Sequence, residues 1–200
     1  MKALLRKKIL LRRERQPQSA LQIKNKKIFL SLFSLPIVQQ ASVFLSYVSF
    51  KKEVATHQII RHLLFKKKWV AVPYITSRDE LGYATIQDFD RDLEPGKFGI
   101  LEPPIVLRKK SPLPPHLHLE VVLVPVVAFD QQNCRLGHGR GYFDRFLNQL
   151  SPRPLTIGLA YQFQYIERVP RHSHDYLLDC IVTEKKIYSN NLVPNLAQHA

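Results

Sequence analysis

The chain has 200 residues, which suffices for one domain or two small ones. It is 45% apolar and 23% charged, an ordinary globular composition that excludes wholesale disorder and a fibrous repeat. The longest apolar run, Val121–Phe129, is shorter than the about 20 residues that a membrane span needs, and two cysteines are too few for a disulfide framework or a four-thiolate zinc site. The charged start, residues 1–8, lacks the apolar stretch of a secretory signal, so we expect a cytoplasmic protein.

The net charge of +14 lies entirely in the first third of the chain. Residues 1–68 hold 16 of the 30 basic residues and only two of the 16 acids, whereas the remainder is balanced. Such asymmetry indicates a polyanionic partner, either nucleic acid, an anionic membrane surface or a phosphorylated and carboxylated small molecule. The alternative interpretation is a solvated helix surface.

The first half of the chain contains three helical patterns and two strand patterns. We expect helices over 2–14, 19–33 and 53–67 and strands over 41–50 and 69–75. Pro17 ends the first helix, Ser19 is a candidate cap for the second, and Pro36 stops it. Residues 79–103 indicate a strand, a polar turn at Glu94–Gly96, and an extended segment.

The second half alternates strands and helices around a long apolar run. Residues 108–115 are expected to form an exposed loop, and Val121–Phe129 a strand buried on both faces. A helix with Phe143, Phe146, Leu147 and Leu150 on one side is followed by strands over 155–161 and 180–183. This order predicts an α/β fold, a single three-layer domain over 1–188 with a mostly parallel, Rossmann-like sheet flanked by helices, and a loose tail over 189–200.

Three of the seven glycines, Gly137, Gly139 and Gly141, alternate in a loop that follows the buried strand and opens a helix. In open α/β sheets, ligands bind beyond the carboxyl ends of strands, and alternating glycines let backbone amides converge on an anion. Arg135 and Arg140 supply guanidinium donors for phosphate or carboxylate oxygens, and Asp144 in the first helical turn suits Mg²⁺. The spacing is neither the Walker pattern nor G-x-G-x-x-G. A simple tight turn is the alternative, but it would not require two arginines.

With these residues, the chain resembles the 5-formyltetrahydrofolate cyclo-ligase family, also called methenyltetrahydrofolate synthetases. The family signature is a strand, Phe-Asp, a turn, and then Arg-Leu-Gly-x-Gly-x-Gly-Tyr-Tyr-Asp, which corresponds to Val124–Asp130 and Arg135–Asp144. The similarity covers residues 2–187. Its other ordered matches are Lys2–Arg6 with Arg12, Tyr47–Thr56, Phe98–Pro103, Gly158–Tyr161 with Gln164, and His174–Glu184.

The chain departs from this pattern at a few positions. Phe143 replaces the second tyrosine, Ala55 stands where an acid is common, and Val126 replaces a frequent glycine. Asn133 also stands at a usual glycine, but asparagine tolerates the left-handed backbone that such turns need. His138 occupies a variable position of the motif.

The resemblance implies an ATP- and Mg²⁺-dependent ligase that converts 5-formyltetrahydrofolate to 5,10-methenyltetrahydrofolate and releases ADP and phosphate. Arg140 and Tyr142 are the implied catalytic residues, and Asp144 and Asp175 the implied Mg²⁺ ligands. The implied ATP-binding residues are Lys2, Ala3, Leu4, Leu5 and Arg6 of the first helix, and Arg135, Leu136, Gly137, His138, Gly139, Arg140, Gly141, Tyr142 and Phe143 of the loop. The implied folate-binding residues are Val48, Phe50, Glu53, His138, Gly139, Arg140, Gly141 and Tyr142.

Three other interpretations remain open at this point. The basic first third would suit a nucleic-acid-binding protein, although the sequence has no recognised nucleic-acid module. A relative that binds folate or nucleotide without catalysis is the second alternative, and a targeting helix over residues 1–15 the third. For the ligase we expect no nucleic-acid or membrane partner, and a monomer.

Overall fold

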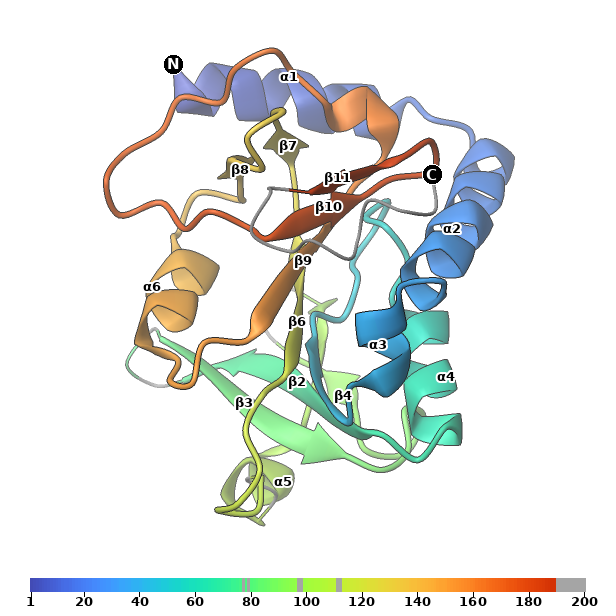
Figure 1. Ribbon diagram of the computed structural model, residues 1–200, viewed down its shortest axis with the longest axis vertical. Coiled ribbons are helices and arrows are strands. Elements are labelled where there is room, and N and C mark those ends of the chain that lie inside the picture. The colour runs from blue at the N-terminus through green and yellow to red at the C-terminus, as the bar shows by residue number, and fades with distance from the viewer. Residues whose placement is uncertain (77, 79, 97–98, 111–112, 190–200) are drawn as a thin grey trace.

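A central seven-stranded sheet organises the protein (Figure 1). The computed structural model describes residues 1–76, 78, 80–96, 99–110 and 113–189. In the sheet the strands follow the order β11-β10-β9-β6-β1-β2-β3. Their bounds are β1 Val43–Ser46, β2 Trp69–Ile75, β3 Leu81–Ile86, β6 Val121–Pro125, β9 Leu155–Leu159, β10 Cys180–Val182 and β11 Ile187–Ser189.

The five inner strands are parallel, and only the outer strands β3 and β11 pair in the antiparallel direction. The sheet therefore has the mostly parallel α/β architecture that the alternation of strands and helices predicted. Two short antiparallel ribbons stand apart from it. They pair β4 Glu94–Pro95 with β5 Leu101–Glu102, and β7 Ala128–Phe129 with β8 Arg135–Leu136.

Helices cover both faces of the sheet. Their bounds are α1 Lys2–Glu14, α2 Gln18–Phe33, α3 Pro36–Gln40, α4 His57–Phe65, α5 Ile105–Lys110 and α6 Tyr142–Gln149. The core residues of α2, α3 and α4 pack on one face, and those of α6 on the other (Figure 1). Helix α1 instead packs through Ile9 against the β7–β8 ribbon, which lies beyond the end of β6.

Successive residues of the central strands point to opposite layers. Phe44 packs with the α2–α4 layer, while its neighbours Val43 and Leu45 pack with the α6 layer, and all three are fully buried. A strand covered on both faces has no solvent side, so its sequence reads as a continuous apolar run. The same reason explains Val121–Val124, whose residues are also fully buried.

Several predicted boundaries are wrong. Gln18, not Ser19, begins α2; its end at Phe33, before Pro36, is as predicted, and Pro36 opens the further helix α3. The polar turn at Glu94–Gly96 contains β4, and part of the expected loop over 108–115 belongs to α5. The strand expected over Val121–Phe129 divides into β6 and β7. Phe98, residues 111–112 and most of the predicted tail lie outside the described residues, whereas Ser189 closes β11.

The predicted strand over 41–50 and helix over 53–67 are both too long, because side chains bind the backbone between them. The Thr56 hydroxyl donates to the Tyr47 carbonyl at 2.6 Å and accepts from the Ser49 amide at 2.9 Å. The Glu53 carboxylate accepts from the Phe50 amide, and Lys51 has a positive φ of 53°. Such local bonds compete with regular structure, so residues 47–56 form an ordered loop and α4 begins only at His57.

The turn that joins β7 to β8 confirms the prediction for Asn133, whose φ is 59°. Both oxygens of Asp130 hold this region, because Oδ1 accepts from the amides of Gln132 and Cys134 and Oδ2 from the amide of Val169. The Asn133 side-chain amide is fully buried and donates to the Asp179 carbonyl at 3.1 Å.

Asn133 offers a direct test of this left-handed turn. Asn133→Ala and Asn133→Gly both lose the contact with Asp179, but only alanine brings a Cβ into the left-handed region. We expect the alanine variant to be less stable than the glycine variant by about 1 kcal/mol. This net difference is the strain of alanine in the left-handed region minus the smaller loss that glycine causes through its greater entropy in the unfolded chain. Urea unfolding of both variants measures the difference. Equal midpoints would show that the backbone at residue 133 is not strained.

Candidate active site

The candidate site lies at the carboxyl edge of the sheet, where the strand order reverses. Strands β1 and β6 are adjacent and parallel. After β1 the chain continues to β2 on one side of this pair, and after β6 it continues to β9 on the other side. Loops 47–56 and 126–141 therefore leave the same edge in neighbouring positions. In open α/β sheets this arrangement forms the crevice in which ligands bind.

The glycine loop after β8 is held between two guanidinium groups. Arg6 of α1 donates from Nε to the Gly137 carbonyl at 2.8 Å, and a Cβ at Gly139 would lie 3.0 Å from the Arg6 guanidinium carbon. On the other side, a Cβ at Gly137 would lie 2.8 Å from Nη1 of Arg135. Gly139 and Gly141 also have positive φ values, of 109° and 68°. Close approach and backbone conformation together explain the alternation of the three glycines.

Arg135 lies beneath the loop rather than on its surface. Its side chain is 3% exposed and donates from Nη2 to Oδ1 of Asp144 at 3.0 Å. Burial lowers the pKa of Arg135, while the charges of Asp144 and Asp175 oppose that shift. Asp144 Oδ1 also accepts from the Tyr176 amide at 3.1 Å. The Arg135–Asp144 pair thus ties the loop to the start of α6.

Asp175, the other predicted metal ligand, binds the first residue of α1. Its Oδ2 accepts from Lys2 Nζ at 2.6 Å and from the His172 amide at 2.6 Å. Burial would raise the pKa of Asp175, but the Lys2 ammonium and the His172 amide outweigh burial and hold that pKa below its ordinary value. Among the described residues, no three His, Cys, Asp or Glu side chains cluster as a metal site. Asp144 and Asp175 still supply the carboxylate oxygens that Mg²⁺ prefers, and both act on the same Arg135 guanidinium.

Arg140 and Tyr142 lie at the outer end of the glycine loop. Arg140 is exposed, and its Nη1 donates to the Tyr142 hydroxyl at 3.3 Å. The Arg145 guanidinium lies 5.5 Å from the centre of the Tyr142 ring and donates to the Arg140 carbonyl at 2.9 Å. Arg145 therefore supports both predicted catalytic residues from the first turn of α6.

A cavity of about 300 Å³ opens beside loop 47–56. Polar and charged side chains from α2 and this loop dominate its wall. The lining residues are Gln18, Leu21, Asn25, Ser49, Phe50, Lys51, Lys52, Glu53, Ala55, His57, Gly99, Leu101 and Tyr161.

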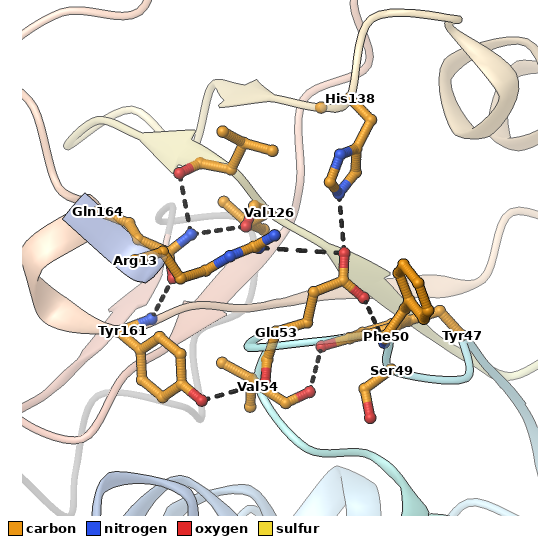
Figure 2. Close-up of polar contacts among 12 residues, drawn as sticks. Arg13, Tyr47, Ser49, Phe50, Glu53, Val54, Val126, His138, Tyr161 and Gln164 are labelled. Carbon is orange, nitrogen blue, oxygen red and sulfur yellow. Dashed lines mark hydrogen bonds and ion pairs between the residues drawn. The ribbon is translucent and has the colours of Figure 1, made fainter. Parts of the chain in front are cut away.

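Glu53 is the centre of the polar contacts at this cavity (Figure 2). Its Oε2 accepts from the Phe50 amide at 3.0 Å, and its Oε1 lies 2.8 Å from Nε2 of His138. Arg13 of α1 approaches the same oxygen, with Nη1 at 4.0 Å. His138 belongs to the glycine loop, so this contact joins the loop to the cavity wall.

The predicted folate-binding residues do not all gather at the cavity. Phe50 and Glu53 line it, and His138 reaches Glu53 from the glycine loop. Val48 is buried and Tyr142 lies on the glycine loop, and neither contributes to the described cavity wall. Of the predicted ATP-binding residues on α1, Arg6 contacts the glycine loop and Lys2 contacts the Asp175 carboxylate, whereas Leu4 is 75% exposed.

Three residues to which the sequence analysis assigned no role in the site, Asn25, Tyr161 and Arg13, complete it. The Tyr161 hydroxyl lies 2.9 Å from Oδ1 of Asn25 and 3.1 Å from the Glu53 carbonyl. Burial raises the pKa of Tyr161 to about 12, so the hydroxyl keeps its proton. The third residue is Arg13. Spacing would have revealed it, because residues 2, 6, 9 and 13 fall on one helix face, whereas Arg12 is exposed and donates to the Phe163 carbonyl.

The fold and the site together define an α/β protein with a glycine loop and a polar cavity at the strand switch point. The model of the 5-formyltetrahydrofolate cyclo-ligase family matches residues 1–184. The chain belongs to this family of ligases. None of the described helices is long and apolar enough to cross a membrane.

Named relatives and solved structures agree with this assignment. The chain is 32% identical to a 5-formyltetrahydrofolate cyclo-ligase of Saccharomyces cerevisiae over 163 residues, which cover 68% of this chain and 72% of the relative. It is 31% identical to the Haemophilus influenzae protein of the same name, covering 72% and 77% of the two chains. The structure of Aquifex aeolicus 5,10-methenyltetrahydrofolate synthetase superposes with a TM-score of 0.78 at 31% identity, covering 94% of this chain and 92% of the other.

The Lys2–Asp175 pair predicts a pH-dependent contribution to stability. Because the pKa of Asp175 is lowered in the folded state, the ion pair stabilises the fold above the ordinary carboxyl range and is lost as pH falls below about 4. Asp175→Asn should therefore be less stable than the wild type by about 1 kcal/mol or less at pH 7. At pH 3 the difference should be smaller, and it should close as the pH falls through the lowered pKa of Asp175 in the folded protein.

Urea unfolding at the two pH values, with far-ultraviolet circular dichroism as the readout, measures this difference. Lys2→Met is the matched variant, since it removes the other partner and should show the same convergence. A difference that persists unchanged at pH 3 would contradict the ion-pair account.

Proposed function

We propose that this protein converts 5-formyltetrahydrofolate to 5,10-methenyltetrahydrofolate, using ATP and Mg²⁺ and releasing ADP and phosphate. The observation that carries the proposal is the contact between His138 and Glu53, at 2.8 Å. This contact joins the glycine loop, to which we assign the nucleotide, to the wall of a polar cavity, and it supports a reaction between a nucleotide and a second ligand. Family membership over residues 1–184 supplies the substrate class.

The reaction needs ATP because a formyl oxygen is a poor leaving group. In the proposed first step the formyl oxygen forms a bond to the γ-phosphorus, the bond between that phosphorus and the β,γ-bridging oxygen breaks, and ADP leaves. N10 then attacks the formyl carbon, the carbon–oxygen bond to phosphate breaks, and N10 loses its proton as the methenyl group forms. The protein's part in phosphoryl transfer is mainly positioning and charge stabilisation.

We assign the nucleotide to the glycine loop and the amino end of α1. Loop 135–143 would cradle the phosphates, with Lys2 and Arg6 approaching from the helix. Arg140 would stabilise the charge on the transferred group, and its exposed position leaves it accessible to a ligand. Asp144 and Asp175 would hold Mg²⁺, which neutralises phosphate charge when bound.

We assign the folate to the cavity of about 300 Å³. Glu53 presents a carboxylate that suits the N–H donors of a reduced pterin, and the Phe50 ring supplies an apolar wall. Tyr142 would contact the ligand from the glycine loop. Val48 would shape the pocket from within the protein, since it is a buried residue of the same loop as Phe50 and Glu53.

A direct assay tests the function. The purified protein is incubated with 5-formyltetrahydrofolate, Mg²⁺ and ATP, and the near-ultraviolet absorbance of the methenyl product is followed, with ATP omitted as the control. We expect ATP-dependent product formation. Binding of both ligands without product would favour a non-catalytic relative, and salt-sensitive binding to nucleic acid without product would favour the nucleic-acid interpretation.

Arg140 provides the sharpest single-residue prediction. Removal of a guanidinium that stabilises transition-state charge should reduce kcat of Arg140→Ala by about 100-fold or more. Arg91→Ala is the matched control, because Arg91 is an exposed arginine that pairs with Asp92 and should leave kcat unchanged. Steady-state kinetics at saturating ATP measures both. Near-wild-type turnover of Arg140→Ala would refute the role of Arg140.

A further inference from the structure

Helix α1 places a buried charge, that of Arg13, beside the cavity. None of the roles assigned above uses this residue. The Arg13 side chain is 6% exposed, and its Nη1 lies 4.0 Å from Oε1 of Glu53. Its Nε has no hydrogen-bond partner among the described residues. A buried guanidinium costs free energy unless a counter-charge compensates it, so its position calls for an explanation.

Attachment of α1 does not explain Arg13. The Lys52 ammonium already anchors the carboxyl end of this helix, since it donates to the carbonyls of Glu14 and Gln16. Ile9 packs the middle of α1 on the β7–β8 ribbon. Moreover, replacing a buried ion pair by apolar side chains is often neutral for stability. The explanation therefore lies with the partner of Arg13, the Glu53 carboxylate.

The groups around Glu53 differ in whether they offer its carboxylate a permanent positive charge. The Tyr161 hydroxyl bonds Asn25, and the Tyr47 hydroxyl bonds the Val54 carbonyl at 2.9 Å. His138 is half-exposed on the glycine loop, and its charge depends on protonation. Arg13, in contrast, is always charged and comes from a rigid helix. It is thus the fixed counter-charge of a carboxylate that is only 12% exposed.

We propose that Arg13 is a positioning residue for the folate-binding carboxylate. The Arg13 guanidinium attracts Oε1 of Glu53 and fixes the orientation of this carboxylate, so that it can accept the N–H donors of the substrate. Arg13 itself does not touch the substrate. This inference rests on the proposed function, in which Glu53 binds the folate.

Steady-state kinetics with each substrate varied in turn tests the proposal. Arg13→Met should raise KM for 5-formyltetrahydrofolate by about tenfold or more, because it removes the charge that orients Glu53. KM for ATP and kcat should change by less than about twofold, since Lys2 and Arg6 of α1 and the glycine loop are unchanged. Arg13→Lys, which keeps the charge, should recover most of the loss. Arg15→Met, on the exposed side of the same helix end, is the matched control and should match the wild type.

A double-mutant cycle separates action through Glu53 from a general structural effect. In the Glu53→Gln background, Arg13→Met should raise KM for the folate by less than about twofold, because its target charge is already absent. Urea unfolding of every variant confirms that the compared proteins are folded, and Arg13→Gln serves as a second neutral variant if Arg13→Met does not fold.

The outcomes distinguish this inference from the function on which it rests. If Glu53→Gln raises the folate KM but Arg13→Met and Arg13→Gln do not, the role of Arg13 is overturned and the proposed function stands. If Arg13→Met raises the folate KM by the same factor in the Glu53→Gln background as in the wild type, the role of Arg13 is also overturned. If Glu53→Gln leaves the folate KM unchanged, both the role of Arg13 and that of Glu53 fail. Absence of any product from the wild type overturns the proposed function itself.

Discussion

Charge pairing along one face of α1 holds the loops of the site in their relative positions. Lys2 binds Asp175, Arg6 binds the Gly137 carbonyl, and Arg13 faces Glu53. These three partners lie on three separate loops. Backbone bonds join two of these segments, since the Leu178 amide donates to the Asn133 carbonyl at 3.3 Å. Helix α1 contacts all three, so it fixes their positions relative to one another. The excess positive charge of the first third thus has a structural use within the molecule, in addition to any attraction for an anionic ligand.

The sheet makes this arrangement possible because it places β1 beside β6. The two loops that follow these strands are distant in sequence but leave the same edge, and His138 meets Glu53 there (Figure 2). Arg6 and Arg135 lie close to Gly139 and Gly137, and Gly139 and Gly141 have positive φ values, which together explain why a chain otherwise poor in glycine has three within five residues. A side chain at Gly137 or Gly139 would push one of these guanidinium groups away.

Much of the fold follows from patterns that need only local information. The helix over 2–14 and the strand over 69–75 have the predicted bounds, because apolar periodicity and flanking breakers define them. Boundaries failed where side chains bind the backbone, as Thr56 and Glu53 do in loop 47–56. β11 was missed for a different reason. It is a three-residue edge strand that forms by pairing with β10, which no local pattern reveals.

The sequence by itself determined the class of fold, the family, and the glycine loop with its two arginines, because strand–helix alternation and a spaced motif are properties of the chain. Tertiary structure decided what each charge does. Arg135 is buried beneath the glycine loop, whereas Arg140 is exposed. Arg13, rather than its neighbour Arg12, faces Glu53. The physical reason is that burial and pairing depend on which face of an element meets which neighbour, and a one-residue step along a helix turns a side chain by about 100°.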